Sequence, residues 1–407
     1  MFSLLFLFLR VHANESLPNE SIRMDPNTIL VLWGTRHGNR QPEVFLDENP
    51  RTWGFEGTSE LTTFGKRQAY GLGRELRIFT GYNKVNTNYN RDQVKYYSSS
   101  ASRCQMTLQV ALAGFHEPVD WADWNQARHD FWSPVPYSID DPLLRMYSVK
   151  ECPNSDNVWR PISQDTLPKL QQKSQETVAL REYCGEQTGW NMTNLGYMAD
   201  LADNLIEIDL YQARYPAWIE RPALPGYNTA RMKKEILSFA EIHQNQCAYY
   251  APCGDLMGGY WLQNLLDSIE VAQEGKGPFI IGYASHTEVT LSVMRLMGID
   301  KNELTTSAGF VLEFRTDPRS SVRLLNHDPN PIDRHVIYQA KYVEALAEKQ
   351  DSDGFIPLED FVSYASAKAI PDWKKACKTA SDYSSKSTGT KFNSFALMTF
   401  LAILALV

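Results

Sequence analysis

The sequence predicts an α/β protein whose parallel sheet is interrupted by a long, mainly helical insertion. Three short apolar or β-rich segments are each followed by a segment with helical character, and strands that alternate with helices are typical of a parallel sheet. Residues 116–260 differ from both flanks, because they are rich in Trp, Tyr, Pro and charged residues. We therefore expect an α/β core built from both ends of the chain, with a helical cap over it.

Each expected strand has its own helix after it. The strands are 28–34, 94–98 and 278–284, and the helices that follow them are 62–79, 103–115 and 287–297. Later, GFVLEFRT and VRLLNHD alternate apolar and polar residues, which favours an antiparallel hairpin on the same sheet. In the insertion we expect helices over 195–211 and 230–242, and we expect the tryptophans between 121 and 132 to pack inside the cap.

These patterns divide the 407 residues into five segments. They are a signal peptide (1–13), the first part of the α/β core (26–115), the cap (116–260), the second part of the core (261–377), and a polar spacer with a hydrophobic anchor signal (378–407).

Both ends of the chain resemble processing signals. FSLLFLFL near the N-terminus is short and apolar, and VHA places small residues where a signal peptidase cuts, although no Lys or Arg precedes the run. A buried N-terminal strand or helix is the alternative. The apolar tail from Phe395 to Val407 is shorter than the ~20 residues of a membrane-spanning helix. It follows the small, polar ASDYSSKSTGTK, which favours a lipid-anchor signal over a single-pass segment or a simple hydrophobic end.

Composition points to the secretory pathway, with an extracellular or lumenal protein held at the membrane by its C-terminus. The six cysteines fit an oxidising compartment and match no zinc signature, and they permit 15 pairings if all are bonded. Asn14, Asn19 and Asn191 begin glycosylation sequons. The net charge of −8 comes without a basic stripe, which argues against a nucleic-acid partner.

Potential cations follow all three core strands. The stretch VLWGTRHGNRQP delivers Arg36, His37 and Arg40, the second strand leads to Arg103, and the third leads to His286. Ligands of open α/β sheets bind at the carboxyl ends of the strands. If the strands are neighbours, three arginines and two histidines therefore meet in one place.

Such a cluster suits a phosphoryl group. Guanidinium groups match phosphate oxygens in pairs and stay charged at any relevant pH, and an oriented histidine can act as a nucleophile. The glycine at position 38 is expected to let the backbone approach the substrate beside the imidazole. The arginines supply the positive field, so we expect neither a metal nor another cofactor.

The sequence RHGNRQP resembles the RHGxRxP signature of the histidine acid phosphatases, a branch of the phosphoglycerate-mutase-like superfamily. Three further blocks are similar to segments of that family: SELTTFGKRQAYGLGRELR, YYSSSASRCQMT and GYASHTEVTLSVMRLMGI. The resemblance implies a phosphoglycerate-mutase-like fold, a three-layer core around the sheet with a smaller helical domain. It implies hydrolysis of small phosphate monoesters, secretion or lysosomal targeting, and leaves a homodimer open.

The resemblance also assigns residue roles. His37 is expected to become phosphohistidine, Arg36, Arg40 and Arg103 to bind the phosphate, and His286 to assist. A disulfide is implied between two cysteines, Cys152 and Cys377. Cys184 receives no partner, and Cys104 is expected as a buried thiol. Glu241, like the Asp140–Asp141 pair, is expected to be solvated rather than catalytic.

One position departs from the family pattern. The usual His-Asp pair, in which the aspartate protonates the leaving group, is here His286-Thr287. Glu288 has the spacing of the His-Ala-Glu found in phytase-like members and is a candidate acid. SHTE also reads as a capping box in which Glu288 only caps a helix. Two alternatives to an acid phosphatase therefore stay open: an inositol-polyphosphate phosphatase that uses Glu288, and a weakly active or inactive phosphate-binding pseudophosphatase.

Overall fold

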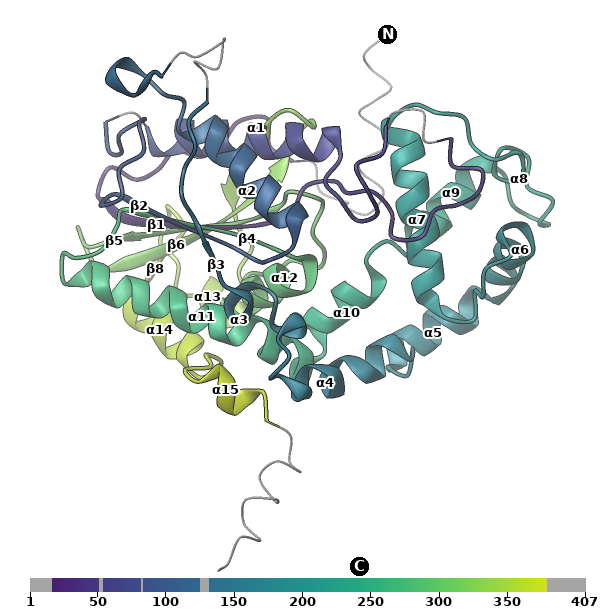
Figure 1. Cartoon of the computed structure of the whole chain (residues 1–407). Coiled ribbons are helices and arrows are strands. Elements are labelled where there is room, and N and C mark those ends of the chain that lie inside the picture. Colours follow the sequence, from purple (N-terminus) through teal and green to yellow (C-terminus); the bar gives the residue numbers. More distant parts are fainter. Residues whose placement is uncertain (1–16, 51–53, 82, 125–131, 379–407) are drawn as a thin grey trace, which may run out of the picture.

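A mixed sheet of eight strands lies at the centre of the structure, a computed structural model that describes residues 17–50, 54–81, 83–124 and 132–378 (Figure 1). The spatial order is β3-β2-β4-β1-β5-β6-β7, and β8 pairs with β6. The strands are β1 (Thr28–Arg36), β2 (Val94–Ser98), β3 (Ser138–Ile139), β4 (Ile280–Ser285), β5 (Gly309–Arg315), β6 (Ser321–Pro329), β7 (His335–Gln339) and β8 (Phe355–Pro357).

The three strands expected to be neighbours are adjacent and parallel. β4 lies between β1 and β2, with Arg36 level with Ser285 and Ser98 level with Ala284. Their carboxyl ends therefore meet at one edge of the sheet. The expected hairpin is also present, because β5 and β6 pair antiparallel.

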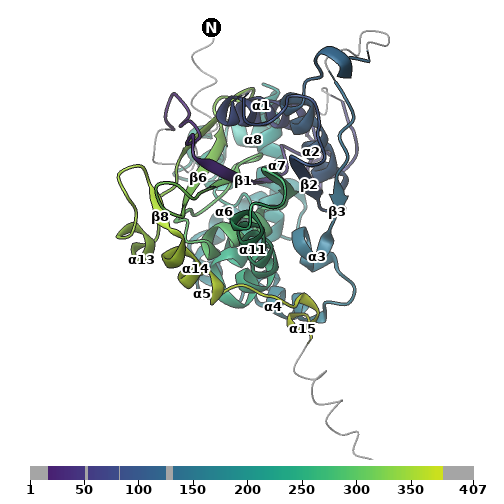
Figure 2. The same cartoon turned by 90° about the vertical axis from the view of Figure 1, so that its left-hand side faces the viewer.

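Helices cover both faces of the sheet and make three layers. Along β1, Leu30 and Leu32 belong to one apolar cluster while Val31 and Trp33 belong to another, as the two-residue period of a strand requires. In Figure 1, α1 (Thr63–Thr80) and α2 (Ser102–Phe115) lie above the sheet, and α11 (Ala251–Gln273), α12 (Thr287–Leu296) and α14 (Leu358–Ser366) lie below it. In the view turned by 90°, α1 and α2 again lie above the strands, and α11 and α14 lie below them (Figure 2). The three-layer α/β prediction is confirmed.

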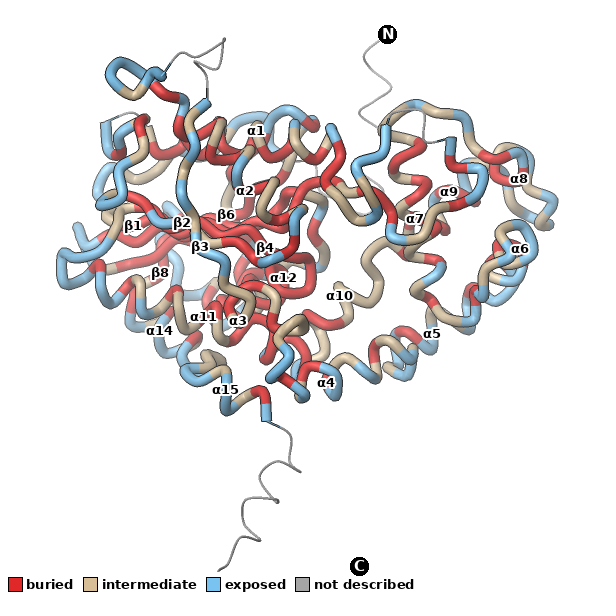
Figure 3. The backbone as a smooth tube through the Cα atoms, viewed as in Figure 1, coloured by how far each residue is buried: buried red, intermediate tan, exposed pale blue. Residues whose placement is uncertain are grey.

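Most residues between the two parts of the core form helices. The first, α3 (Asp141–Leu144), lies beneath the sheet next to α11, and the others stand on the right of Figure 1. These others are α4 (Pro153–Ser163), α5 (Pro168–Glu176), α6 (Val178–Thr188), α7 (Leu195–Leu210), α8 (Ala217–Glu220), α9 (Thr229–Leu237) and α10 (Ile242–Tyr249). We call this group the cap. Backbone burial is concentrated in the sheet and in the inward faces of these helices (Figure 3). The short helices α13 (Glu344–Ala347) and α15 (Trp373–Ala376) complete the second part of the core.

The insertion differs from its predicted form in two ways, apart from the short strand β3, which pairs with β2 and is compatible with a mainly helical segment. The expected boundary at residue 260 falls inside α11, a continuous helix of 23 residues. Trp121, Trp124 and Trp132 are 79%, 45% and 37% exposed, so the expectation that these tryptophans pack inside the cap is wrong for the three.

The helix expected over 230–242 is broken. α9 ends at Leu237, and α10 begins at Ile242. Between them Glu241 adopts a left-handed backbone conformation with φ 54°, which is uncommon for a residue with a long side chain. The break decides where the Glu241 side chain lies.

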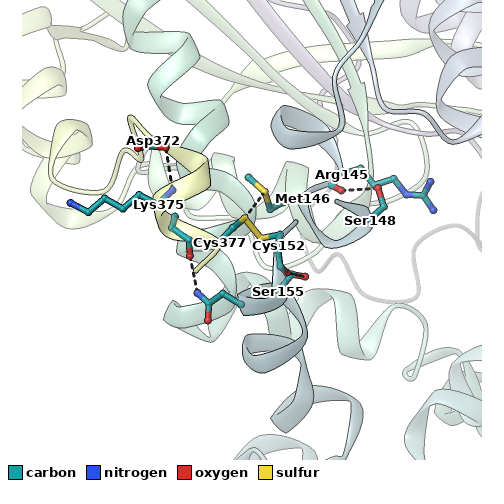
Figure 4. Close-up of a disulfide and its surroundings, with 10 residues drawn as sticks. Arg145, Met146, Ser148, Cys152, Ser155, Asp372, Lys375 and Cys377 are labelled. Atoms are coloured by element: carbon teal, nitrogen blue, oxygen red, sulfur yellow. Dashed lines mark hydrogen bonds between the residues drawn. A yellow bond between two sulfur atoms is a disulfide. The ribbon is translucent and has the colours of Figure 1, made fainter. Parts of the chain in front are cut away.

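One disulfide ties the cap to the end of the core. Cys152, just before α4, is bonded to Cys377 after α15, 225 positions along the chain (Figure 4). The backbone N–H of Asn154 also donates to the Cys377 carbonyl oxygen, at 3.1 Å. The structure therefore contains the disulfide that the resemblance implies.

The remaining cysteines fall into two kinds. Cys247 and Cys253 form a second disulfide, which the sequence left open. Cys104 and Cys184 are free and buried, and burial raises the pKa of the Cys104 thiol to about 11 and that of Cys184 to about 12. Both thiols therefore stay protonated at neutral pH.

The processing signals lie largely outside the described residues. The expected signal peptide (1–13), Asn14 and the tail from 379 are not described, whereas Asn19 and Asn191 are exposed. Within the described ranges, no helix combines the length and apolarity needed to cross a membrane.

Candidate active site

The end of β1 holds His37 in a defined orientation. The His37 backbone N–H donates to the Ser285 carbonyl at 3.0 Å, which ties it to the end of β4. Its side-chain Nδ1 lies 2.9 Å from the Gly38 carbonyl oxygen. Because a carbonyl only accepts, Nδ1 carries the ring proton and Nε2 keeps its lone pair. This is the tautomer that a nucleophilic imidazole needs.

Close packing after β1 requires a glycine at position 38. A Cβ at this position would lie 2.5 Å from the Gly65 carbonyl oxygen in α1. The Gly38 N–H donates to Thr107 Oγ1 of α2 at 3.1 Å. The glycine therefore lets the loop after β1 pack against α1 and α2, and the expected approach of its backbone to the substrate stays a prediction.

Two arginines lie beside the imidazole, and each meets a carboxylate. Arg36 donates from Nη1 to the Leu304 carbonyl at 2.7 Å and from Nη2 to Glu241 Oε1 at 2.5 Å. Arg40 Nη2 lies 2.9 Å from Asp203 Oδ2 and 3.9 Å from Glu241 Oε1. Both carboxylates come from the cap, Asp203 from α7 and Glu241 from the turn before α10.

Arg103 and His286 meet at the ends of the other two strands. Arg103 Nη2 lies 3.3 Å from His286 Nδ1, and His286 Nε2 lies 3.0 Å from Ser99 Oγ. Since a guanidinium only donates, Nδ1 of His286 accepts and Nε2 carries the proton. The His37 and His286 rings stand edge to face with centroids 5.6 Å apart. The strand ends therefore converge, as the sequence predicts.

These side chains surround a cavity of about 410 Å³. Five of the six predicted site residues line it: His37, Arg40, Arg103, His286 and Glu288. The sixth, Arg36, is buried and reaches the cavity wall through Glu241. The remaining lining residues are Glu43, Ser59, Arg145, Tyr147, Ser155, Asp156, Trp159, Glu241, Gln244 and Thr287. The volume falls within the range of small-molecule sites.

The two histidines are held neutral. Burial, followed by the charges of Arg103 and Arg36, lowers the pKa of His37 well below its usual range. Burial and Arg103 do the same to the pKa of His286. A neutral His37 keeps its Nε2 lone pair into the acidic range, which suits a nucleophile in a site that also collects positive charge.

Glu288 lies at the start of α12 and belongs to the cavity. α12 begins at Thr287, its N-cap is His286, and Ser285 donates its hydroxyl to the Leu144 carbonyl at 2.7 Å. Ser285 is the last residue of β4 and not the N-cap, and Glu288 is the second residue of the helix rather than the third. The capping-box interpretation of Glu288 is therefore wrong. Burial, with a smaller contribution from the Glu241 carboxylate, raises the pKa of Glu288. A raised pKa keeps a carboxyl protonated, as a general acid requires.

Glu241 is the site residue that the sequence analysis missed. Its side chain is only 11% exposed, and Oε2 accepts a hydrogen bond from Thr287 Oγ1 at 2.9 Å. The expectation that Glu241 is solvated is therefore wrong. The sequence predicts a continuous helix through residue 241, and no local motif identifies this position as part of a site. Asp140 caps α3 through Leu143 N, and Asp141 accepts from Ser100 N, so that pair stays outside the cavity.

The cavity carries mixed charge. Besides Arg40 and Arg103 it holds Arg145, and against these stand the carboxyl groups of Glu43, Asp156, Glu241 and Glu288. The sequence RMKKE at 231–235 is also basic, but none of its residues lines the cavity; Arg231 pairs with Glu235, and Lys233 pairs with Asp209. Among the described residues no cluster of three or more His, Cys, Asp or Glu side chains is arranged to hold a metal ion.

Comparison with known proteins places the chain in one family. The profile of the histidine phosphatase superfamily (branch 2) matches residues 28–315. The lysosomal acid phosphatase of Homo sapiens is 22% identical over 389 residues, covering 93% of this chain and 86% of the relative. Putative acid phosphatase 5 of Caenorhabditis elegans is 28% identical over 163 residues, or 38% of this chain and 37% of the relative.

Solved structures share the fold. The phytase of Hafnia alvei bound to myo-inositol hexakis sulphate superposes with a TM-score of 0.61 at 15% identity, covering 88% of this chain and 100% of the phytase. The Citrobacter braakii phytase gives a TM-score of 0.59 at 16% identity, covering 86% and 99%. At this identity the likeness establishes the architecture alone.

Proposed function

Because the chain belongs to the histidine phosphatase superfamily (branch 2) and is a phosphoric monoester hydrolase, we propose that it acts as an acid phosphatase through a phosphohistidine on His37. The observation that carries this proposal is the neutral imidazole at the end of β1, with its proton on Nδ1 and the Arg40 and Arg103 guanidinium groups lining the same cavity.

In the first half-reaction, His37 Nε2 attacks phosphorus. The Nε2–P bond forms while the bond from phosphorus to the ester oxygen breaks. The leaving oxygen takes the proton of the Glu288 carboxyl group, so an alcohol departs rather than an alkoxide. Glu288 is left ionised, and the phosphoryl group is covalently held on His37.

In the second half-reaction, water attacks the phosphoryl group. The Glu288 carboxylate takes one proton from the water, the new P–O bond forms and the Nε2–P bond breaks. Inorganic phosphate leaves, and Glu288 and His37 return to their starting protonation states. Arg40 and Arg103, which line the cavity, hold the oxygens throughout, and the buried Arg36 adds positive charge from behind Glu241, since phosphoryl transfer depends mainly on positioning and charge stabilisation.

The mixed charge of the cavity favours a substrate with a single phosphate. A highly phosphorylated inositol needs several cations beyond those at the reacting phosphate. Among the described residues that line the cavity, Arg145 is the one further cation, opposite the exposed carboxylates of Glu43 and Asp156. Tyr147 and Trp159 provide apolar surface for the leaving group. Although the structural relatives are phytases, these features support a small monoester.

A pseudophosphatase is the weaker alternative. The observation that suggests it is Thr287, which stands at the position of the family aspartate. However, Glu288 places a buried carboxyl group in the same cavity. The cavity that contains the nucleophile therefore still contains a carboxyl group with a raised pKa, which is what a proton donor requires. We therefore assign the proton-donor role to Glu288.

Steady-state kinetics of the purified protein on an aryl phosphate, an alkyl phosphate and inositol hexakisphosphate test this proposal. We expect turnover of both monoesters at acidic pH and kcat/KM at least about tenfold lower for the hexakisphosphate. Absence of turnover on every substrate would support the pseudophosphatase. A preference for the hexakisphosphate would replace the monoesterase by the inositol-polyphosphate phosphatase.

We place the protein in the secretory pathway. Its two disulfides suit an oxidising compartment, and lysosomal acid phosphatases are among its relatives. The signal peptide, glycans on Asn14, Asn19 and Asn191, the C-terminal lipid anchor and a homodimer remain proposals. Release from cells by a phosphatidylinositol-specific phospholipase tests the anchor, and retention with the tail still present would favour a spanning segment.

A further inference from the structure

A carboxylate of the cap already lies where phosphate is expected to bind. Glu241 Oε1 is 2.5 Å from Arg36 Nη2 and 3.9 Å from Arg40 Nη2. Its other oxygen, Oε2, accepts from Thr287 Oγ1 at 2.9 Å. An anion that binds Arg40 in this cavity therefore lies beside Glu241, which lines the same cavity, while the threonine hydroxyl holds the carboxylate in place from its other side.

The groups that face Glu241 come from four elements. Arg36 and Arg40 approach from the end of β1, Arg103 from α2, and two carboxyl groups, Asp203 and Glu288, from α7 and α12. Burial would raise the pKa of Glu241, but the two arginines of β1 outweigh it, and the pKa is lowered. Since the pKa of Glu241 is lowered and that of Glu288 is raised from the same ordinary value, Glu241 loses its proton at a lower pH than Glu288 does.

An ionised carboxylate distinguishes between protonation states of an anion. It can only accept hydrogen bonds, and a like charge beside it is strongly disfavoured. A phosphate monoester carries one negative charge below its second pKa of about 6 and then has a P–OH group. That hydroxyl can donate to Oε1, whereas a fully ionised phosphate or a sulfate brings only acceptors.

We propose that Glu241 is a specificity-determining residue that admits the protonated, singly charged phosphoryl group and rejects fully ionised anions. This inference rests on the proposed function, because it takes the arginines as the phosphate site. The P–OH donates to Glu241 Oε1, and the other oxygens accept from Arg40 and Arg103, which line the cavity. Activity at acidic pH then has two causes: the substrate must carry its P–OH proton, and Glu288 must carry the proton for the leaving group.

The same arrangement gives a reason for Thr287. An aspartate here would place a second carboxylate against Glu241 Oε2, which now accepts the threonine hydroxyl. Two ionised oxygens at that distance repel each other. Threonine instead donates to Glu241 and keeps it directed at the arginines, while the neighbouring residue, Glu288, carries the proton for the leaving group.

Inorganic phosphate and sulfate are the probes, because they have similar shape and only phosphate holds a proton at mildly acidic pH. Their inhibition constants are measured against aryl phosphate hydrolysis, and their affinities by calorimetry, for the wild-type chain, Glu241→Gln and Glu182→Gln. Glu182 is exposed on α6 and does not line the cavity, so its variant removes the same charge away from the arginines.

We expect the wild-type chain to bind phosphate at least about tenfold more tightly than sulfate, since like-charge contact costs several kcal/mol. Glu241→Gln should lower that preference at least about tenfold, mainly by strengthening sulfate, because its amide can donate. Glu182→Gln should leave it within about twofold, because an exposed charge away from the cavity is screened by solvent. An unchanged preference in Glu241→Gln, or equal weakening of both anions, would overturn the inference.

The wild-type chain provides a second test if Glu241→Gln does not fold. Phosphate affinity should fall as pH rises and H₂PO₄⁻ loses its proton, while sulfate stays weak until Glu241 itself is protonated at low pH. Equal binding of both anions by the wild type overturns the role of Glu241 and leaves the phosphatase intact. Binding of neither anion overturns the proposed phosphate site as well.

Discussion

The core and the cap contribute opposite charges to one cavity. The core supplies Arg36, His37, Arg103 and His286 at or just after the ends of three parallel strands. The cap supplies carboxylates to the same arginines, above all Glu241, which is 205 positions from Arg36 in the chain. The core builds a general anion site, and the cap restricts which anion can use it. Substitutions in the two regions should therefore have different kinetic signatures.

The largest effect is expected at His37. Replacing His37 by alanine removes the nucleophile and should lower kcat by about 10⁴–10⁶-fold on aryl and alkyl phosphates alike. The control is His243→Ala, because His243 pairs with Asp165 in the cap and does not line the cavity. Steady-state kinetics of both variants make the comparison, and a His37→Ala enzyme with ordinary turnover would show that the core does not supply the nucleophile.

Glu288→Gln comes next and should depend on the substrate. A general acid contributes about 10²–10⁴-fold, and an alkyl alcohol needs its proton far more than a phenol does. The variant should therefore lose alkyl phosphate turnover by roughly that factor and aryl turnover much less. Equal losses on both substrates would remove Glu288 from the proton-transfer step.

The pH profile provides a second measurement on the same residue. Burial raises the pKa of Glu288, and the donor is present only below that pKa, so alkyl turnover should fall as pH rises through it. The pKa of His37 is lowered, so its neutral form persists toward acidic pH. In Glu288→Gln the decline of kcat at saturating substrate should disappear, while the decline of kcat/KM that follows the substrate's own proton should remain. Persistence of the decline in kcat would assign it to another group.

Arg103→Ala should have a smaller effect, spread over both substrates. Loss of one donor to a developing oxyanion typically costs about 10²–10³-fold, and Arg103 also donates to His286. Arg103→Lys should restore only part of the lost activity, because an ammonium cannot make the bidentate hydrogen bonds of a guanidinium group. An Arg103→Ala enzyme with unchanged kcat/KM would exclude this arginine from phosphate binding.

The smallest kinetic effect is expected from the disulfide that joins cap and core. Replacing Cys152 and Cys377 together by alanine should lower the free energy of unfolding by about 2–5 kcal/mol. At temperatures where the variant is folded, its phosphate-to-sulfate preference should stay near that of the wild type. Denaturant unfolding and inhibition kinetics measure the two quantities. A changed preference without lost stability would mean that this bond positions the cap carboxylates.

The sequence predicted the core side of the site because its signals are local. β1, β2 and β4 are short apolar runs, and each cation follows directly after one of them or at the start of the next helix. Once the strands are parallel neighbours, Arg36, His37 and His286 must lie at one edge. The resemblance to a known family added the roles, and the cysteine pair between residues 152 and 377.

The cap side could not be predicted in the same way. Glu241 reaches Arg36 only because the chain breaks between α9 and α10 with a left-handed residue, and the sequence around it reads as continuous helix. The capping-box motif at 285–288 failed for a related reason, since strand pairing keeps Ser285 in β4. Contacts between distant segments override local propensity at these positions, which is common where a site is formed.

The central claim is that the phosphoryl group passes through His37, and trapping the intermediate tests it most directly. Wild-type protein is mixed with an aryl phosphate at acidic pH, denatured rapidly under alkaline conditions that preserve phosphohistidine, digested and examined by mass spectrometry. We expect an acid-labile phosphoryl group on the peptide that contains His37, and none on this peptide in His37→Ala. Phosphate attached to another residue, or rapid turnover with no covalent intermediate, would contradict the account.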